Sequence, residues 1–212
     1  SPAASAAKKP PKPKPLTVSA LPIDVAKDPW AWHSMNINDW PAHTFPPISV
    51  FGRAYQGKVE STLFMTMLKV GTPVLAAYTG KVMRISPQPE TCDTEVYIEL
   101  PTGGTRHGSY DHIIPTVKVG DSVTVGKQIG TVPAWQCSMP FGGFELMILE
   151  ETPQGLQARC PLSILAPNTA KSVRTQVRSV MDAWNAYAGS ASSAYTAEDL
   201  TRGICATMYA PA

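Results

Sequence analysis

The sequence lacks a long apolar run and is poor in charge. No stretch reaches the roughly 18 consecutive apolar residues that indicate a membrane-spanning helix. Only 16% of the 212 residues are charged, against about 25% in typical soluble proteins. The net charge of +2 is too small for a protein that binds nucleic acid through a basic surface. We therefore expect no membrane span and no nucleic-acid partner.

Cysteine is also scarce, and no pair has the Cys-x-x-Cys spacing of a zinc knuckle or a thioredoxin-type redox site. The even number fits two disulfides formed in an oxidising compartment, and four buried free thiols are the alternative. Four cysteines allow three pairings, and spacing alone does not choose among them. We favour Cys92 with Cys137 within a β-rich region, and Cys160 with Cys205, which would fasten a helical region to it.

Proline is abundant, with 21 residues, and its distribution separates the first part of the chain from the rest. Residues 1–15 contain lysine and proline but no large apolar side chain, so we expect a disordered leader that serves as a spacer, as an arm or only as a solvated end. Its first residues are also compatible with the product of signal-peptide cleavage. Residues 16–50 carry tryptophans among prolines, which predicts an extended segment anchored by its aromatic side chains to the following domain.

Residues 51–165 have the pattern of a β domain. Short runs rich in β-branched residues alternate with glycine turns, and Glu95–Leu100 alternates polar and apolar side chains as a half-buried strand does. Pro101–Gly104 is typical of a hairpin turn.

Residues 166–212 change to helical spacing and predict a C-terminal appendage. Asn168 or Thr169 can cap a first helix that Gly189 ends. Its apolar face comprises Val173, Val177, Val180, Met181, Trp184 and Tyr187. A second helix is expected to begin at Thr196 and to carry Leu200, Ile204 and Met208.

Two segments within residues 51–150 are more specific than composition. Gly71–Val82 reads GTPVLAAYTGKV and Val117–Gly130 reads VKVGDSVTVGKQIG, with Tyr110-Asp111-His112 shortly before the second. Their order and spacing resemble the lysostaphin-like (LytM) peptidase family. The resemblance implies a mainly β fold, a β-barrel or sandwich of the duplicated-hybrid-motif type, with the N-terminal arm and the helical appendage added to it.

The same resemblance implies that the zinc ligands of the family are missing. Members bind zinc through His-x-x-x-Asp and the last histidine of His-x-His, which leaves one position for an activated water. The corresponding positions here are Ser61, Met65 and Gly143, which cannot form such a site. His112 matches a histidine that does not bind the metal in the family, and with Tyr110 it completes the predicted relic groove. Alternatively, His112 is a structural residue held by hydrogen bonds, with no role in binding a ligand.

A metal site elsewhere is not expected from the remaining histidines. None of the four has a second histidine two residues away, and only His107 has an aspartate four residues on, Asp111. In a regular strand Asp111 and His112 face opposite sides, so they should not bind one ion together. Residues 107 and 111 would lie about 13 Å apart along the strand. We therefore expect no catalytic residue, no metal and no cofactor.

The expected function is binding. A peptidase-like domain without its catalytic ligands keeps a groove, which suits a regulatory or binding protein of the cell envelope. We expect this protein to be periplasmic or extracellular and its partner to be peptidoglycan or another protein. The alternative is a structural subunit of a large assembly, such as a secretion system or a phage tail. The protein would then be a secretion-machine or virion component, because the aromatic arm and the helices suit packing on neighbouring subunits. The weakest alternative is a zinc endopeptidase that cleaves peptidoglycan cross-links.

Overall fold

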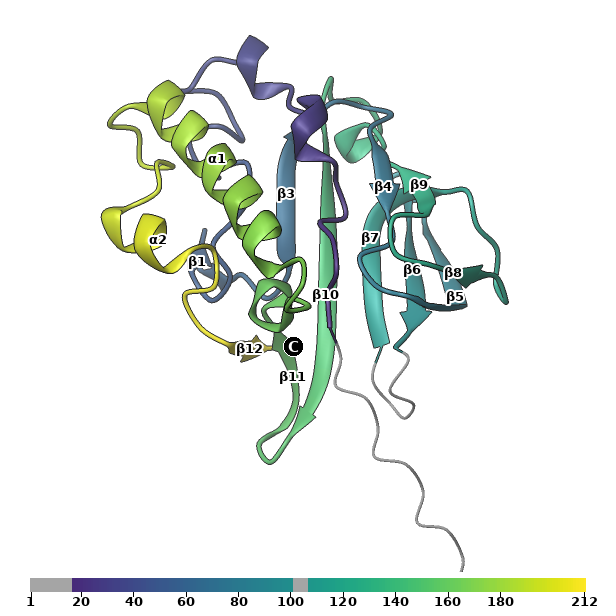
Figure 1. The fold of residues 1–212 in the computed structure, drawn as a ribbon. Coiled ribbons are helices and arrows are strands. Elements are labelled where there is room, and N and C mark those ends of the chain that lie inside the picture. The colour runs from purple at the N-terminus through teal and green to yellow at the C-terminus, as the bar shows by residue number, and fades with distance from the viewer. Residues whose placement is uncertain (1–16, 101–106) are drawn as a thin grey trace, which may run out of the picture.

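The computed structural model describes residues 17–100 and 107–212, and most of their strands belong to one large antiparallel sheet (Figure 1). Its main path runs in the order β12-β11-β10-β7-β6-β5-β8, while β3 pairs with β10 and β9 pairs with both β4 and β7. The strands are β3 (Leu63–Leu68), β4 (Pro73–Leu75), β5 (Gly80–Gln88), β6 (Asp93–Glu99), β7 (His107–Pro115), β8 (Ser122–Val123), β9 (Gln128–Thr131), β10 (Gly142–Thr152), β11 (Gly155–Arg159) and β12 (Tyr209–Pro211). The predicted mainly β fold class is confirmed.

A separate two-stranded sheet, β1 (Ala54–Tyr55) with β2 (Lys58–Val59), precedes the main one. The hairpin turn predicted at Pro101–Gly104 and the leader at residues 1–15 lie outside the described residues. The strands on either side of that turn, β6 and β7, do pair antiparallel.

The alternation predicted for residues 95–100 is present in β6. Val96 and Ile98 are buried, while Glu95, Tyr97 and Glu99 are only half-buried. In β3, by contrast, all six residues are buried, because other parts of the chain cover both of its faces.

Residues 17–50 supply much of that cover. Trp30 forms a bridge with Leu68, and Ile48 forms one with Met65. Two short 3-10 helices, η1 (Val25–Lys27) and η2 (Trp32–Ser34), interrupt the segment. The Trp32 ring meets that of Trp184 edge-on, with 5.4 Å between centroids. The segment therefore packs against its own chain, and its buried residues belong to the same hydrophobic core as the strands.

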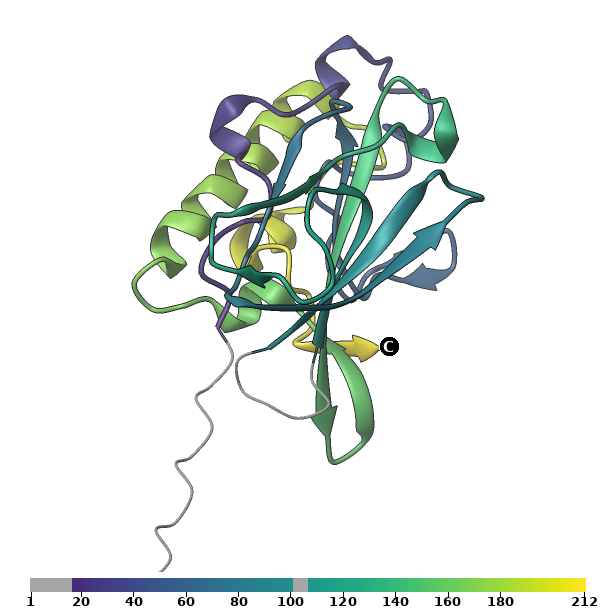
Figure 2. The same ribbon diagram turned by 90° about the vertical axis from the view of Figure 1, so that its right-hand side faces the viewer.

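Helix α1 (Ala170–Ala188) lies beside β3 and buries the predicted apolar face from Val173 to Trp184 (Figures 1 and 2). Gly189, at φ 59°, follows the end of the helix as predicted, while Thr169 stands at the N-cap position without a capping hydrogen bond from its side chain. Neither α1 nor any other helix in the described part of the chain has the length and apolar character needed to cross a membrane.

The second helix is shorter than predicted. Helix α2 (Ala197–Arg202) begins after Thr196 but ends at Gly203, whose φ of 78° breaks the helix. Ile204 and Met208 therefore lie beyond it, and Tyr209–Pro211 pairs with β11 as β12, a strand that the helical spacing did not predict.

Both predicted disulfides are confirmed. Cys160–Cys205 is buried at Cys160 and joins the end of β11 to the segment after α2. Cys92–Cys137 is exposed and joins the residue before β6 to the short helix η3 (Trp135–Cys137). A fourth 3-10 helix, η4 (Pro161–Ile164), follows Cys160.

A buried ion pair fixes α2 against the turn before β1. Asp199 has only 4% of its side chain exposed and accepts hydrogen bonds from Arg53, Thr196 Oγ1 and the Thr196 backbone N–H. Burial alone would raise the pKa of Asp199, but these hydrogen bonds and the charge of Arg53 outweigh it, so the pKa is lowered.

We predict that Asp199→Asn lowers the free energy of unfolding at pH 7 by about 3 kcal/mol, because it leaves the Arg53 guanidinium without its partner. The folded-state pKa of Asp199 lies below the unfolded value of about 3.9, so its stabilisation is complete above that value and is lost as the pH falls through the folded-state pKa. Urea unfolding measured from pH 7 to pH 2.5 should show the difference in the free energy of unfolding between Asp199→Asn and the parent protein disappearing below about pH 4.

Glu198→Gln is the matched control. Glu198 pairs with Arg202 on the exposed face of the same helix, so we expect a change within about 0.5 kcal/mol. A difference in the free energy of unfolding between Asp199→Asn and the parent protein that stays constant down to pH 2.5 would contradict the ion-pair explanation.

Candidate functional site

A bulge in β7 brings the chemistry-bearing side chains together. Thr94 of β6 pairs with Ile113 of β7 and Val96 pairs with Tyr110, so Asp111 and His112 both stand opposite the single residue Glu95. His112 accommodates the extra residue by adopting a positive φ of 57°. Such a bulge interrupts the alternation of side chains along the strand.

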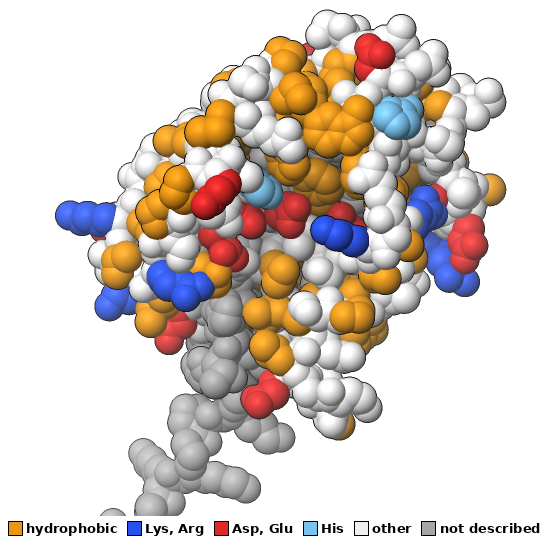
Figure 3. All heavy atoms as spheres, turned by 180° about the vertical axis from the view of Figure 1, so that it is seen from behind, with side chains coloured by type: hydrophobic (Ala, Val, Ile, Leu, Met, Phe, Trp, Pro, Cys, Tyr) orange, Lys and Arg blue, Asp and Glu red, His pale blue; other side chains and the backbone are white. Residues whose placement is uncertain are grey.

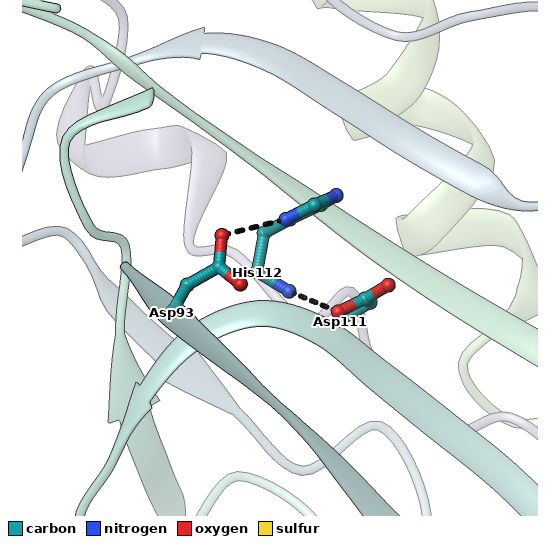
Figure 4. A group of neighbouring side chains, drawn as sticks. All are labelled: Asp93, Asp111 and His112. Carbon is teal, nitrogen blue, oxygen red and sulfur yellow. Dashed lines mark hydrogen bonds and ion pairs between the residues drawn. The ribbon is translucent and has the colours of Figure 1, made fainter. Parts of the chain in front are cut away.

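The expectation that Asp111 and His112 cannot share a site is therefore wrong. Ligand-type atoms of Asp93, Asp111 and His112 all lie within 4.8 Å of one another. Asp93 points at the imidazole ring and its Oδ2 lies 2.8 Å from His112 Nδ1, while Asp111 Oδ1 accepts from the His112 backbone N–H at 2.8 Å (Figure 4). The three side chains therefore form a candidate metal-binding group, whose donor atoms would have to move closer together to bind one ion.

The second nitrogen of His112 faces a further carboxylate. Glu145 of β10 pairs with Asp111 across the sheet, and its Oε1 lies 3.9 Å from His112 Nε2. On the other side, the indole of Trp135 packs on the imidazole with 4.8 Å between ring centroids.

Burial perturbs the acid–base behaviour of this cluster. It raises the pKa of Asp111 and of Glu145, although the charge of His112 opposes both shifts. Burial would lower the pKa of His112, but Asp111 and the hydrogen bond to Asp93 outweigh it and the pKa is raised. The carboxyl groups of Asp93, Asp111 and Glu145 thus surround a single imidazole.

A cleft of about 510 Å³ adjoins this cluster, and Glu145 belongs to both. Its walls come from residues 40–66, from η3 and from β10, and its lining includes five aromatic side chains and two carboxyl groups, those of Glu60 and Glu145. Figure 3 shows acidic side chains and a histidine gathered in a hollow on the face opposite that of Figure 1, with hydrophobic side chains above them.

The residues predicted for the relic groove do not form a site together. Met65 is fully buried and belongs to the core. Tyr110 is also fully buried, where its hydroxyl accepts from the Ala77 backbone N–H at 2.9 Å. Ser61 is half-buried just before β3, whereas His112 and Gly143 both lie against Trp135, which lines the cleft.

Trp135 occupies the space in front of Gly143. A β-carbon at position 143 would lie 2.6 Å from Cζ3 of that indole and 3.1 Å from Phe64 Cε2. At the three positions that the resemblance assigns to zinc ligands, Ser61 carries a hydroxyl, Met65 carries a buried thioether and Gly143 has no side chain. This donor set does not fit the zinc ion that the family binds.

Sequence reasoning did not identify Asp93, Glu60, Glu145 or Trp135 as site residues. Asp93 precedes Asp111 by 18 residues and meets it only because β6 and β7 pair with a bulge. Glu145 lies in β10, and nothing in the spacing of the sequence indicates its contact with His112.

No protein-family model matches the sequence, and no curated protein matches it at a significant level. Among solved structures, the chain is similar to a mutant catalytic domain of the prophage-encoded M23 protein EnpA from Enterococcus faecalis, with 22% identity over 58% of this chain and 91% of that one and a TM-score of 0.44. It is also similar to the catalytic domain of the antimicrobial peptidase lysostaphin from Staphylococcus simulans, with 21% identity, coverage of 53% and 84%, and a TM-score of 0.38.

A third similar structure is that of LytU, with 19% identity over 66% of this chain and 96% of that one and a TM-score of 0.44. At these identities the likeness concerns the fold. The predicted resemblance to a lysostaphin-like domain is confirmed at that level.

We predict that Gly143→Ala destabilises the protein by about 2 kcal/mol, because the added methyl group overlaps the ring of Trp135. Trp135→Leu combined with Gly143→Ala should recover part of this loss, and a double-mutant cycle of urea unfolding measures the coupling. Additive effects of the two substitutions would show that the indole does not occupy this space.

Proposed function

We propose that this protein is a non-catalytic, peptidase-like domain that binds peptidoglycan or an envelope enzyme through its aromatic and acidic cleft. The observation that carries the proposal is the packing of Trp135 over Gly143. The position where the family places its last zinc ligand is filled by a ring that also forms a wall of the cleft. A pocket rearranged in this way is suited to holding a ligand.

Two disulfides support a location outside the reducing cytoplasm, in the periplasm or the extracellular space. The alternative role as an assembly subunit draws on the low charge, the aromatic arm and the appended helices. Residues 17–50 pack against their own chain, so the arm favours the binding role over this alternative.

A metal-dependent hydrolase is the second candidate, and the cluster of Asp93, Asp111 and His112 is the observation in its favour. Two carboxylates and an imidazole are a reasonable ligand set for zinc or manganese. Against it, Asp93 is buried and already hydrogen-bonded to the imidazole and to Thr91, so a metal ion would have to replace those contacts.

One set of assays separates the two candidates. Purified protein is dialysed against excess zinc and then against buffer, its metal content is measured, and it is tested for release of dye-labelled peptidoglycan and for co-sedimentation with sacculi. We expect less than 0.1 equivalent of zinc (roughly a tenth, the level of non-specific carry-over), no release, and retention on sacculi. Stoichiometric zinc together with peptidoglycan release, both lost in Asp111→Asn, would establish the hydrolase instead.

The binding role predicts that the cleft mediates retention on sacculi. Trp40→Ala should weaken co-sedimentation by about tenfold, because an exposed aromatic side chain at the cleft is lost. Leu156→Ala, which removes an exposed apolar side chain from the β10–β11 hairpin, is the matched control and should have no effect. Equal retention of both variants and the parent protein would contradict binding through the cleft.

A further inference from the structure

Five aromatic rings form a continuous row along the cleft. Neighbouring rings in this row have centroids 5.3 to 6.5 Å apart. In order, the row contains Tyr55, Phe45, Phe64, Trp135 and Trp40. Trp40 is 36% exposed, so this end of the row is open to solvent. Ring faces and edges that line an open cleft offer a surface for an alkyl chain and, through their quadrupoles, for a cation.

Two carboxylates lie in the same cleft. Glu60 accepts from the Thr62 backbone N–H and hydroxyl at 2.9 and 2.8 Å, which fixes its orientation. Glu145 keeps 27% of its side chain exposed. Burial raises the pKa of both groups, and the charge of Glu60 adds to the shift at Glu145. The two carboxylates therefore repel one another in a partly desolvated site, and a cation bound there would relieve this repulsion.

The positive groups near these carboxylates leave room for a ligand cation. His112 approaches Glu145 from the β7 side at 3.9 Å, and two further carboxylates, Asp93 and Asp111, compete for it. Lys58 lines the cleft from β2 and is an exposed residue. The groups facing the cleft and its adjoining cluster thus comprise four carboxylates, one imidazole and one exposed lysine.

We propose that the cleft binds peptides through a primary amine on a flexible chain, with the ammonium group between Glu60 and Glu145 and the chain along the aromatic row. This deepens the proposed function, on which it rests for the use of the cleft, by naming the ligand class. A neutral sugar would stack on the rings but leave the carboxylates uncompensated, and an anion would be repelled. A volume of about 510 Å³ suits one such side chain with its adjoining backbone.

The test compares two peptides that differ only in charge. Acetyl-Gly-Lys-Gly-amide and its Nε-acetyl-lysine counterpart are titrated into the full ¹⁵N-labelled chain, and the indole N–H signals of Trp40 and Trp135 are followed. We expect millimolar binding of the lysine peptide and an affinity at least about tenfold lower for the acetylated peptide. Equal affinity for the two peptides would overturn the proposal.

Two substitutions of opposite effect sharpen the test. Glu145→Gln keeps the shape of the side chain and removes its charge, so the lysine peptide should bind about tenfold more weakly. Lys58→Met removes a competing cation from the cleft and should tighten binding by about twofold or more. Lys127→Met, which removes an exposed lysine just before β9, is the matched control and should bind as the parent does.

The outcomes also separate this inference from the proposed function. Retention on sacculi without discrimination between the two peptides would overturn the amine specificity and leave the binding role intact. Amine binding at the two indoles without retention on sacculi would overturn the binding to peptidoglycan and leave the amine specificity intact. Folding of each variant is checked by its ¹⁵N spectrum, and an unchanged affinity in folded Glu145→Gln would overturn the placement of the ammonium group.

Discussion

The extra residue in β7 is the constraint on which the candidate site depends. With regular pairing, Asp111 and His112 would point to opposite faces of the sheet, one toward the core and one toward solvent. The bulge opposite Glu95 instead sets His112 against Asp93, Glu145 and Trp135 at once. A local departure from strand geometry thus creates a partly buried cluster in which charge, hydrogen bonding and aromatic packing converge on one imidazole.

The walls of the cleft come from segments that are distant in the sequence, so tertiary links hold them in place. The Cys92–Cys137 disulfide is one such link, because Cys92 directly precedes the buried Asp93 and Cys137 belongs to the same short helix as Trp135. The bridge of Ile48 to Met65 is another, because it ties the segment that carries Trp40 and Phe45 to β3. The cleft can therefore be open to solvent and still have a defined shape.

Much of the fold was predictable from the sequence. Glycine turns, the alternation in residues 95–100 and the spacing of Val173 to Trp184 follow from local backbone preference, and the structure contains the corresponding strands and helix. The limits of α2 were missed because Gly203 overrides the apolar spacing at Ile204 and Met208.

The site was less predictable, for a physical reason. A periodic pattern assumes regular strands, whereas His112 owes its position to a positive φ that histidine seldom adopts and that no spacing reveals. The partners Asp93 and Glu145 come from strands on either side of β7, so they are brought together only by pairing. Gly143 stands in the sequence where the resemblance places a zinc ligand, but the packing of Trp135 against it could not be predicted.

The packing of Trp135 on Gly143 also bears on how such a domain could change in evolution. A histidine introduced at position 143 would overlap the indole, and displacing the indole would remove a ring from the middle of the aromatic row. Acquiring a zinc ligand there would therefore require the cleft to be given up first or at the same time, through a less stable intermediate. The contact between the indole and Gly143 makes the shape of the cleft depend on the absence of a side chain at position 143.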